Sequence, residues 1–451
     1  MKFLNIMDNN KQIFLLGYMV LFLLYAFFPY SILKTIMLPI VILILITSYP
    51  NLKDYNKYLA LVLFVIGTVL MIYNKANIGD VIRGFTDNAG LISLILTVPL
   101  LSVIFDYDNF NSIISSLTEK YITSPKSFYV TTLFIINSIG MLLNLASIPL
   151  VHQILGNTSQ NYHKRLYYRA LTRGFCVNLL WSPNFVSIAI VLNYIDISWY
   201  KLAPFGFLLA MLNNIIGLFM ERKYLKQEQF RGKIGKAEQI DKRKVFKLVF
   251  LLLSLIIFIV LLEFIIGKSV LVVVPLVSII APVIFALGLK KLDVLKKKVN
   301  KYYTGILLDK HNEVFLFTAI GFFGYALGNS PFKQYIPMLI EKLGINTSVP
   351  IILFILLVIA GLSIIGVHPL VSISAIAVTV PVASTPLNEL QMALTLLTGY
   401  MMYNLLSPFS IPTLVMTGLT RESPLAVSLN INLYYVMVSG IITTLVCMLI
   451  G

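Results

Sequence analysis

Long apolar stretches separated by short polar turns run along nearly the whole chain. Each stretch is roughly 16–23 residues long, which lets one α-helix cross about 30 Å of hydrocarbon. The pattern therefore predicts an all-α polytopic membrane protein with about eleven transmembrane helices. The expected spans are residues 13–30, 31–49, 58–73, 89–106, 168–195, 199–220, 245–266, 268–289, 313–328, 389–418 and 427–450.

Two further stretches, near residues 128–157 and 350–383, look like re-entrant hairpins. Full crossings are the alternative, because residues 128–150 alone are long enough to reach across a bilayer. The choice matters because one crossing more or less in a half of the chain changes the orientation of the next half.

The chain contains an internal repeat. Residues 171–183 read LTRGFCVNLLWSP and residues 397–408 read LTGYMMYNLLSP. Upstream, SIPLV (147–151) matches GVHPLV (366–371), and LTEKYITSP (117–125) matches IEKLGINTSVP (340–350). A duplication of this kind inside an apolar chain indicates a transporter with a binding site between its two halves.

The composition excludes a soluble globular protein. Hydrophobic residues make up 58% of the chain and charged residues 12%, and the mean hydropathy is +0.88. Two cysteines, Cys176 and Cys447, provide neither a disulfide framework nor the spacing of a metal site. The first apolar run follows Lys2 and Lys11, but it has no small-residue cleavage site, so we expect a retained helix and not a signal peptide.

The net charge of +16 follows the expected topology. Basic residues concentrate in 222–247 and 290–310, which two spans separate, so both stretches face the same side. The positive-inside rule makes that side cytoplasmic, with the N-terminus inside and the C-terminus outside. This distribution indicates an integral protein of the cytoplasmic membrane with some attraction to anionic lipid, and it argues against a nucleic-acid partner.

The same topology predicts how the chain is divided. After the first span, each half has an odd number of crossings plus one hairpin, so the second half should be inverted. We expect a leading helix (1–30), a first repeat (31–221), a basic cytoplasmic linker (222–244) and a second repeat (245–451). The first hairpin would enter from the cytoplasm and the second from outside.

Two Ser-Pro sites interrupt apolar spans, at Pro183 and Pro408. Proline removes an amide donor and frees carbonyls upstream, which is costly in lipid unless the break faces protein or a wet cavity. Kinks whose Ser and Asn bond neighbouring helices are the alternative. The candidate ligand-binding side chains are Asn178, Ser182 and Asn184 in the first half and Asn404, Ser407, Ser410 and Thr413 in the second, with the carbonyls of Leu179, Leu180, Leu405 and Leu406 as candidate Na⁺ ligands.

The expected hairpins carry a second set of candidates. Asn144, Ser147 and Pro149 would lie at or near the first tip. The second hairpin contains Gly366, His368, Pro369, Ser372 and Ser374. Three roles stay open for His368: a satisfied polar group, a proton-coupling group or a substrate contact.

Acidic residues are scarce in the expected membrane interior. This scarcity favours Na⁺ over a carboxylate proton relay as the means of coupling, and it favours an anionic or neutral substrate over a cation.

Arg169 and Arg173, four residues apart, are interpreted either as an anion-recruiting pair at the cytoplasmic mouth or as positive-inside anchors. Asn213, Asn214, Asn430 and Asn432 are expected to bond between helices. The glycines of GFFGYALG (321–328) are expected to allow close helix packing.

This arrangement resembles the ion transporter superfamily, which holds divalent-anion/Na⁺ symporters, arsenite and citrate carriers and related permeases. The likeness covers residues 31–450 and rests on NLASIPLV (144–151), NLLWSPN (178–184), GVHPLVSIS (366–374) and NLLSPFSIPT (404–413). It implies elevator-type motion of a transport domain against a scaffold, commonly in a homodimer. Neither tip has the Ser-Asn-Thr signature that holds carboxylate and Na⁺ in the dicarboxylate branch, which argues against a dicarboxylate.

Three functions remain from the sequence. The first is a secondary active transporter of a small organic or inorganic anion, coupled to Na⁺ or H⁺ and without a cofactor. The second is an exporter or flippase of a lipid-linked or envelope precursor, attracted by the basic loops. The third, a membrane-embedded transferase, is disfavoured because the four histidines are dispersed and the outside loops are short. No GxxxxGK[ST] loop is present, which argues against a nucleotide-driven pump.

Overall fold

The computed structural model describes residues 11–52, 54–107, 110–159, 162–226, 242–342, 344–345 and 347–450, and in these ranges every regular element is a helix or a helical turn. The first half contains α2 (Lys11–Phe27), α3 (Ser31–Ser48), η1 (Tyr49–Asn51), α4 (Asp54–Tyr73), α5 (Ile78–Thr86), α6 (Ala89–Leu101), η2 (Ser102–Tyr107), α7 (Phe110–Tyr121), α8 (Pro125–Leu143), η3 (Asn144–Ala146), α9 (Ser147–Ser159), α10 (Lys164–Cys176), η4 (Val177–Leu180), α11 (Val186–Tyr194), α12 (Trp199–Met220) and α13 (Arg222–Leu225).

The second half begins with α14 (Lys242–Ile266) and α15 (Val270–Gly288) and ends with the long helix α24 (Leu429–Ile450). Between them lie α16 (Leu292–Lys301), η5 (Tyr302–Ile306), η6 (Leu308–Lys310), α17 (His311–Gly328), η7 (Pro331–Gln334), α18 (Tyr335–Lys342), α19 (Ser348–Ile364), α20 (Pro369–Thr379), η8 (Val382–Ser384), α21 (Glu389–Leu406), α22 (Ile411–Thr420) and α23 (Pro424–Val427).

Several helices have the length and surface of membrane spans. Within the described residues, eight are long and apolar enough to cross a bilayer, or nine when one bent pair is counted as a span. Their outer faces carry large apolar side chains, such as Phe264 at 74% exposed and Leu449 at 88% exposed. Such faces need surrounding hydrocarbon, so the chain is an all-α integral membrane protein.

The expected spans agree well with the observed helices, but six short helices, α5, α7, α13, α16, α18 and α23, were not expected. None of them contains an apolar run long enough for a span, which is the pattern on which the prediction rests; α5 is amphipathic and begins with a capping box between Asn77 and Asp80. The count by length differs from eleven because α2 and the parts of the two broken spans are too short, and α17 is counted only within the bent pair. One of the eight, Pro125–Gly156, contains α8 and α9. Residues 227–241, most of the expected basic linker, lie outside the described residues, as do residues 1–10 and 451.

The chain turns back on itself between α8 and α9. The ring centroids of Phe128 in α8 and His152 in α9 each lie 5.8 Å from that of Tyr167. The two rings are therefore within about 12 Å of each other, whereas a straight helix would separate them by about 36 Å.

The helices α19 and α20 form a second hairpin. The Ser348 hydroxyl, at the start of α19, donates to the Pro386 carbonyl beyond the end of α20 at 3.2 Å. The chain reverses at Gly366, whose φ of +88° favours glycine. Both stretches that the sequence marked as hairpins thus fold back in the structure.

The two broken helices run in opposite directions. α10 packs against α22, and η4 and α11 pack against α21. Consistent with this, Lys164 at the start of α10 lies 3.9 Å from Glu422, just beyond the end of α22. The start of α10 and the end of α22 are therefore on the same face of the molecule.

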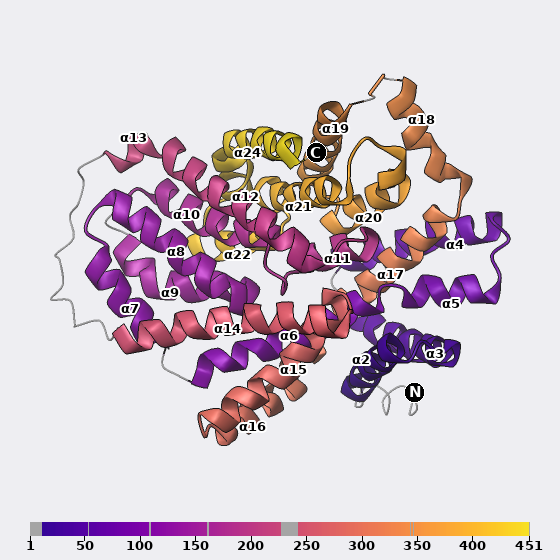
Figure 1. The fold of residues 1–451 in the computed structure, drawn as a ribbon, viewed down its shortest axis with the longest axis horizontal. Helices are drawn as coiled ribbons and strands as arrows, with labels where there is room; N and C mark the ends of the chain where they lie inside the picture. Colours follow the sequence, from indigo (N-terminus) through magenta and orange to yellow (C-terminus); the bar gives the residue numbers. More distant parts are fainter. Residues whose placement is uncertain are drawn as a thin grey trace.

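The helices form two groups. The hairpin bundle consists of α8–α12 and α19–α24, and the framework bundle consists of α2–α6 and α14–α17. Figure 1 shows α8, α9 and α10 on the left with α22 beside them, α2 and α3 at the lower right, and α4 and α5 above these at the right. The helices α20 and α11 contact the framework bundle through α17 and α6, respectively. The hairpins and breaks therefore lie together in one of the two bundles.

Candidate functional site

The first break (residues 177–185) contains buried polar atoms that the protein leaves unpaired. Asn178 and Ser182 are fully buried and Asn184 is 2% exposed. Both amide atoms of Asn178, the Ser182 hydroxyl and Asn184 Oδ1 have no hydrogen-bond partner among the described residues. An unpaired buried polar group costs about 1–3 kcal/mol, so a cluster of them indicates a place where a ligand or ordered water bonds.

The first hairpin tip (Asn144–Ala146) closes over this break. Asn144 Nδ2 donates to the Asn184 carbonyl at 3.4 Å, and Asn184 Nδ2 donates to the Met141 carbonyl at 3.0 Å. The Asn144 backbone has φ +50° and ψ −131°, an unusual conformation for a residue with a side chain. Ser147 Oγ donates to the Asn144 carbonyl at 2.6 Å, and Pro149 lies in the first turn of α9.

The second break (residues 407–410) has the same sequence motif but satisfies its own polar groups. Ser410 Oγ bonds the Asn404 carbonyl at 2.9 Å and the Thr413 hydroxyl at 2.8 Å. Asn404 Nδ2 donates to the Tyr400 carbonyl at 2.9 Å, and Ser407 Oγ accepts the Phe409 amide at 3.3 Å. The two breaks are therefore chemically unequal, and the first has more capacity to bind a ligand.

The second hairpin tip (residues 365–368) meets the second break. A Cβ added at Gly366 would lie 2.8 Å from the Phe409 ring. His368 caps the N-terminus of α20, where its Nδ1 accepts the Leu370 amide at 3.4 Å, and its ring centroid is 6.3 Å from that of Tyr403. Pro369 is the first residue of α20, in which Ser372 and Ser374 are buried. In each half a tip thus meets a break, whereas Ser372 and Ser374 lie further along α20.

The backbone carbonyls of the breaks are less free than the sequence suggested. The Leu179 carbonyl accepts the Ser187 hydroxyl at 2.7 Å, and the Leu405 carbonyl accepts Asn432 Nδ2 at 3.4 Å. The Leu180 carbonyl oxygen lies against Gly206 of α12. Leu406 is the last residue of α21 and is 2% exposed. Each carbonyl oxygen has two lone pairs, so the bonded ones keep one for a cation.

The expected roles of Arg169 and Arg173 need correction, because both pair with a buried carboxylate. Arg169 Nη1 lies 2.6 Å from Glu221 Oε2, and Arg173 Nη1 lies 2.8 Å from Glu221 Oε1. Arg173 is 2% exposed and Glu221 is 1% exposed, so Arg173 is neither a surface anchor nor free at a mouth. No pattern in the sequence indicated Glu221, because it follows directly on an apolar span and precedes the basic stretch.

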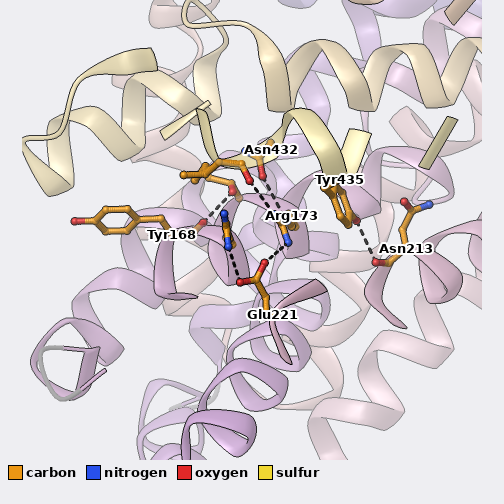
Figure 2. Close-up of polar contacts among 9 residues, drawn as sticks. Tyr168, Arg173, Asn213, Glu221, Asn432 and Tyr435 are labelled. Atoms are coloured by element: carbon orange, nitrogen blue, oxygen red, sulfur yellow. Dashed lines mark hydrogen bonds and ion pairs between the residues drawn. The ribbon is translucent and has the colours of Figure 1, made fainter. Parts of the chain in front are cut away.

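Asn432 connects these charges with the second break, because its Nδ2 donates to the Leu405 carbonyl at 3.4 Å. Figure 2 shows its contact with Arg173. Arg173 Nε donates to Asn432 Oδ1 at 3.0 Å, and Arg173 Nη2 donates to the Ile431 carbonyl at 2.9 Å. The guanidinium lies 4.4 Å from the ring centroid of Tyr435, whose hydroxyl donates to the Asn213 carbonyl at 3.2 Å. Asn432 thus bonds between helices as expected, whereas the Asn213 side chain bonds within its own helix.

The glycines of α17 receive side chains from three other segments. A Cβ added at Gly321, Gly324 or Gly328 would lie 2.8–2.9 Å from Asn88, Tyr194 or Val378, respectively. The same residues line a pocket of about 480 Å³ between the hairpin and framework bundles. Gly324 and Gly328 therefore permit close packing between the two bundles, and Gly321 permits close packing within the framework bundle.

Gly206 of α12 allows the backbone of the first break to approach closely. A Cβ at this position would overlap the Leu180 carbonyl oxygen. Gly206→Ala is expected to cost about 1–3 kcal/mol of stability, measured as a lower melting temperature of the detergent-purified protein. Gly418→Ala is the matched control, because a Cβ at Gly418 meets no atom within 4 Å. Equal melting temperatures of the two variants would contradict the close approach.

Comparison with known proteins supports this fold. No family model matches the chain, and no curated protein matches it. Among the solved structures that match is the crystal structure of the YdaH transporter of Alcanivorax borkumensis, described as having an unusual topology. The two chains are 14% identical with a TM-score of 0.58, and the match covers 87% of this chain and 97% of that chain. The chain therefore shares its fold with a membrane transporter.

Proposed function

We propose that the chain is a secondary active transporter that moves a small organic or inorganic anion across the cytoplasmic membrane, coupled to Na⁺ or H⁺. The structural likeness to a transporter supports transport in general. The substrate would bind where the hairpin tips meet the breaks, near the middle of the membrane. This arrangement matches the positions at which transporters built from repeats bind solutes.

In this proposal residues 31–221 and 245–451 are inverted repeats. The opposite directions of the two broken helices support the inversion, since Lys164 before one lies near Glu422 after the other. The hairpin bundle would act as the transport domain and the framework bundle as the scaffold. Alternating access would then come from an elevator-type movement of one bundle against the other, within a homodimer.

The observation that carries the proposal is the set of unpaired polar atoms at the first break. Asn178, Ser182 and Asn184 offer hydroxyl and amide groups in a buried position. Amide N–H and hydroxyl groups can donate to an anion, while amide and hydroxyl oxygens suit Na⁺. Ion and substrate would bind the same closed arrangement of tip and break, so each raises the affinity for the other.

Reconstitution into proteoliposomes tests this function. Uptake of radiolabelled sulfate, succinate and benzoate would be measured with an inward Na⁺ gradient, an inward H⁺ gradient or no gradient. We expect saturable uptake of at least one anion that follows one of the gradients and is absent from protein-free liposomes. Absence of uptake for every anion, together with movement of a labelled lipid-linked precursor, would instead favour the exporter or flippase function.

A further inference from the structure

The buried arginines of α10 form a cluster whose charges do not cancel. We call Arg169, Arg173 and Glu221 the charge cluster. Within the described part of the chain, the ion pairs of both arginines involve Glu221, which leaves one positive charge in excess. Arg169 Nε is buried and has no hydrogen-bond partner among the described residues. The formal charges of two arginines and one glutamate therefore give the cluster a net charge of +1.

Arg173 connects this cluster with both breaks. The Val177 amide, at the start of the first break, bonds the Arg173 carbonyl, so Arg173 is one helical turn from that break. On the other side, Asn432 alone separates the Arg173 guanidinium from the Leu405 carbonyl at the second break. Figure 2 shows Arg173 held between Glu221 and Asn432. The rest of the deeply buried charge in the described residues is Glu263, which accepts the Trp199 and Tyr200 amides at the other end of α12.

We infer that the net positive charge of the cluster selects anions at the proposed transport site, with Arg169 as the specificity-determining residue. Arg173 and Glu221 form a neutral pair, so Arg169 supplies the excess charge. Arg169 is nine residues before Asn178, about 14 Å along the helix. At that distance and an effective dielectric constant of about 20, a unit charge changes the affinity for a monovalent anion roughly sevenfold. The inference rests on the proposed function and names the residues that make its binding site select an anionic substrate.

Variants that change the cluster charge test this inference. Arg169→Gln lowers the net charge to about zero but leaves the Arg173–Glu221 pair, so we expect anion affinity to fall about sevenfold. Arg169→Lys keeps the charge and should bind nearly as wild type does. Glu221→Gln adds one positive charge but removes the carboxylate that the two arginines share, so its yield should fall. The protein that still purifies as a monodisperse fraction should bind anions more tightly, a gain that damaged folding cannot produce. The double variant R169Q/E221Q restores the original charge and should recover the affinity that R169Q loses.

Affinity would be measured by thermal shift and uptake with sulfate, succinate and benzoate, and Arg165→Gln serves as an exposed control on the same helix. Equal losses in R169Q and R169K, or a double variant that purifies as a monodisperse protein yet binds no better than R169Q, would overturn the electrostatic role while leaving the transporter intact. If none of the three anions raises the melting temperature of the wild type or is taken up by it, the proposed anionic substrate is wrong. The inference is then wrong as well.

Discussion

Glu221→Ala is expected to lower the stability of the protein by about 3–5 kcal/mol, because it removes the carboxylate that two arginines share in a buried site. Glu221 is 1% exposed and lies within 2.8 Å of both guanidinium groups. Without it, Arg173 would remain 2% exposed with an uncompensated charge. The loss would appear as a large fall in melting temperature and in the yield of monodisperse protein after purification.

Glu422→Ala provides the matched control. Its carboxylate is 37% exposed and lies 3.9 Å from the exposed Lys164. Exposed ion pairs contribute about 0–1 kcal/mol, so this variant should melt close to the wild type. A Glu221→Ala protein that is as stable as Glu422→Ala would show that the buried charges are compensated in some other way.

Asn178→Leu is expected to separate stability from function. Both amide atoms of Asn178 are buried without a partner, so an apolar side chain of similar size should raise stability by about 1–3 kcal/mol. The same change removes polar groups that we propose contact the substrate or its coupling ion. The melting temperature without ligand should therefore rise. The increase in melting temperature on adding an anion, and the gradient-driven uptake, should be lost.

Asn432→Leu is the matched control for this prediction. Asn432 is as deeply buried as Asn178, but its side chain bonds Arg173 and the Leu405 carbonyl. The same substitution should therefore destabilise the protein, because it leaves two buried groups without a partner. If Asn178→Leu were destabilising to a similar degree, Asn178 would have a structural role.

The breaks and the tips could be located from the sequence because their causes are local. Proline interrupts a helix wherever it stands, so Pro183 and Pro408 mark the ends of regular structure within a few residues. Gly366 reverses the chain with a backbone conformation that favours glycine. These features depend on neighbouring residues and not on distant partners.

The charge cluster could not be derived in this way. Arg173 bonds Glu221 and Asn432, which are 48 and 259 positions away, and nothing near Arg173 indicates either partner. The different hydrogen bonding of the two breaks could not be predicted either, because both contain Asn-Leu-Leu before Ser-Pro. Only in the second break does a serine, Ser410, bond both the Asn404 carbonyl and the Thr413 hydroxyl at the start of α22. Repetition of a motif therefore predicts a shared backbone shape but not a shared set of hydrogen bonds.

A density map of the purified protein with its transported anion and coupling ion bound would test the central claim most directly. We predict ligand density at the first break, within hydrogen-bonding distance of Asn178, Ser182 or Asn184 and beneath the tip at Asn144. Ligand density elsewhere, with these three side chains bonded only to protein, would contradict the account.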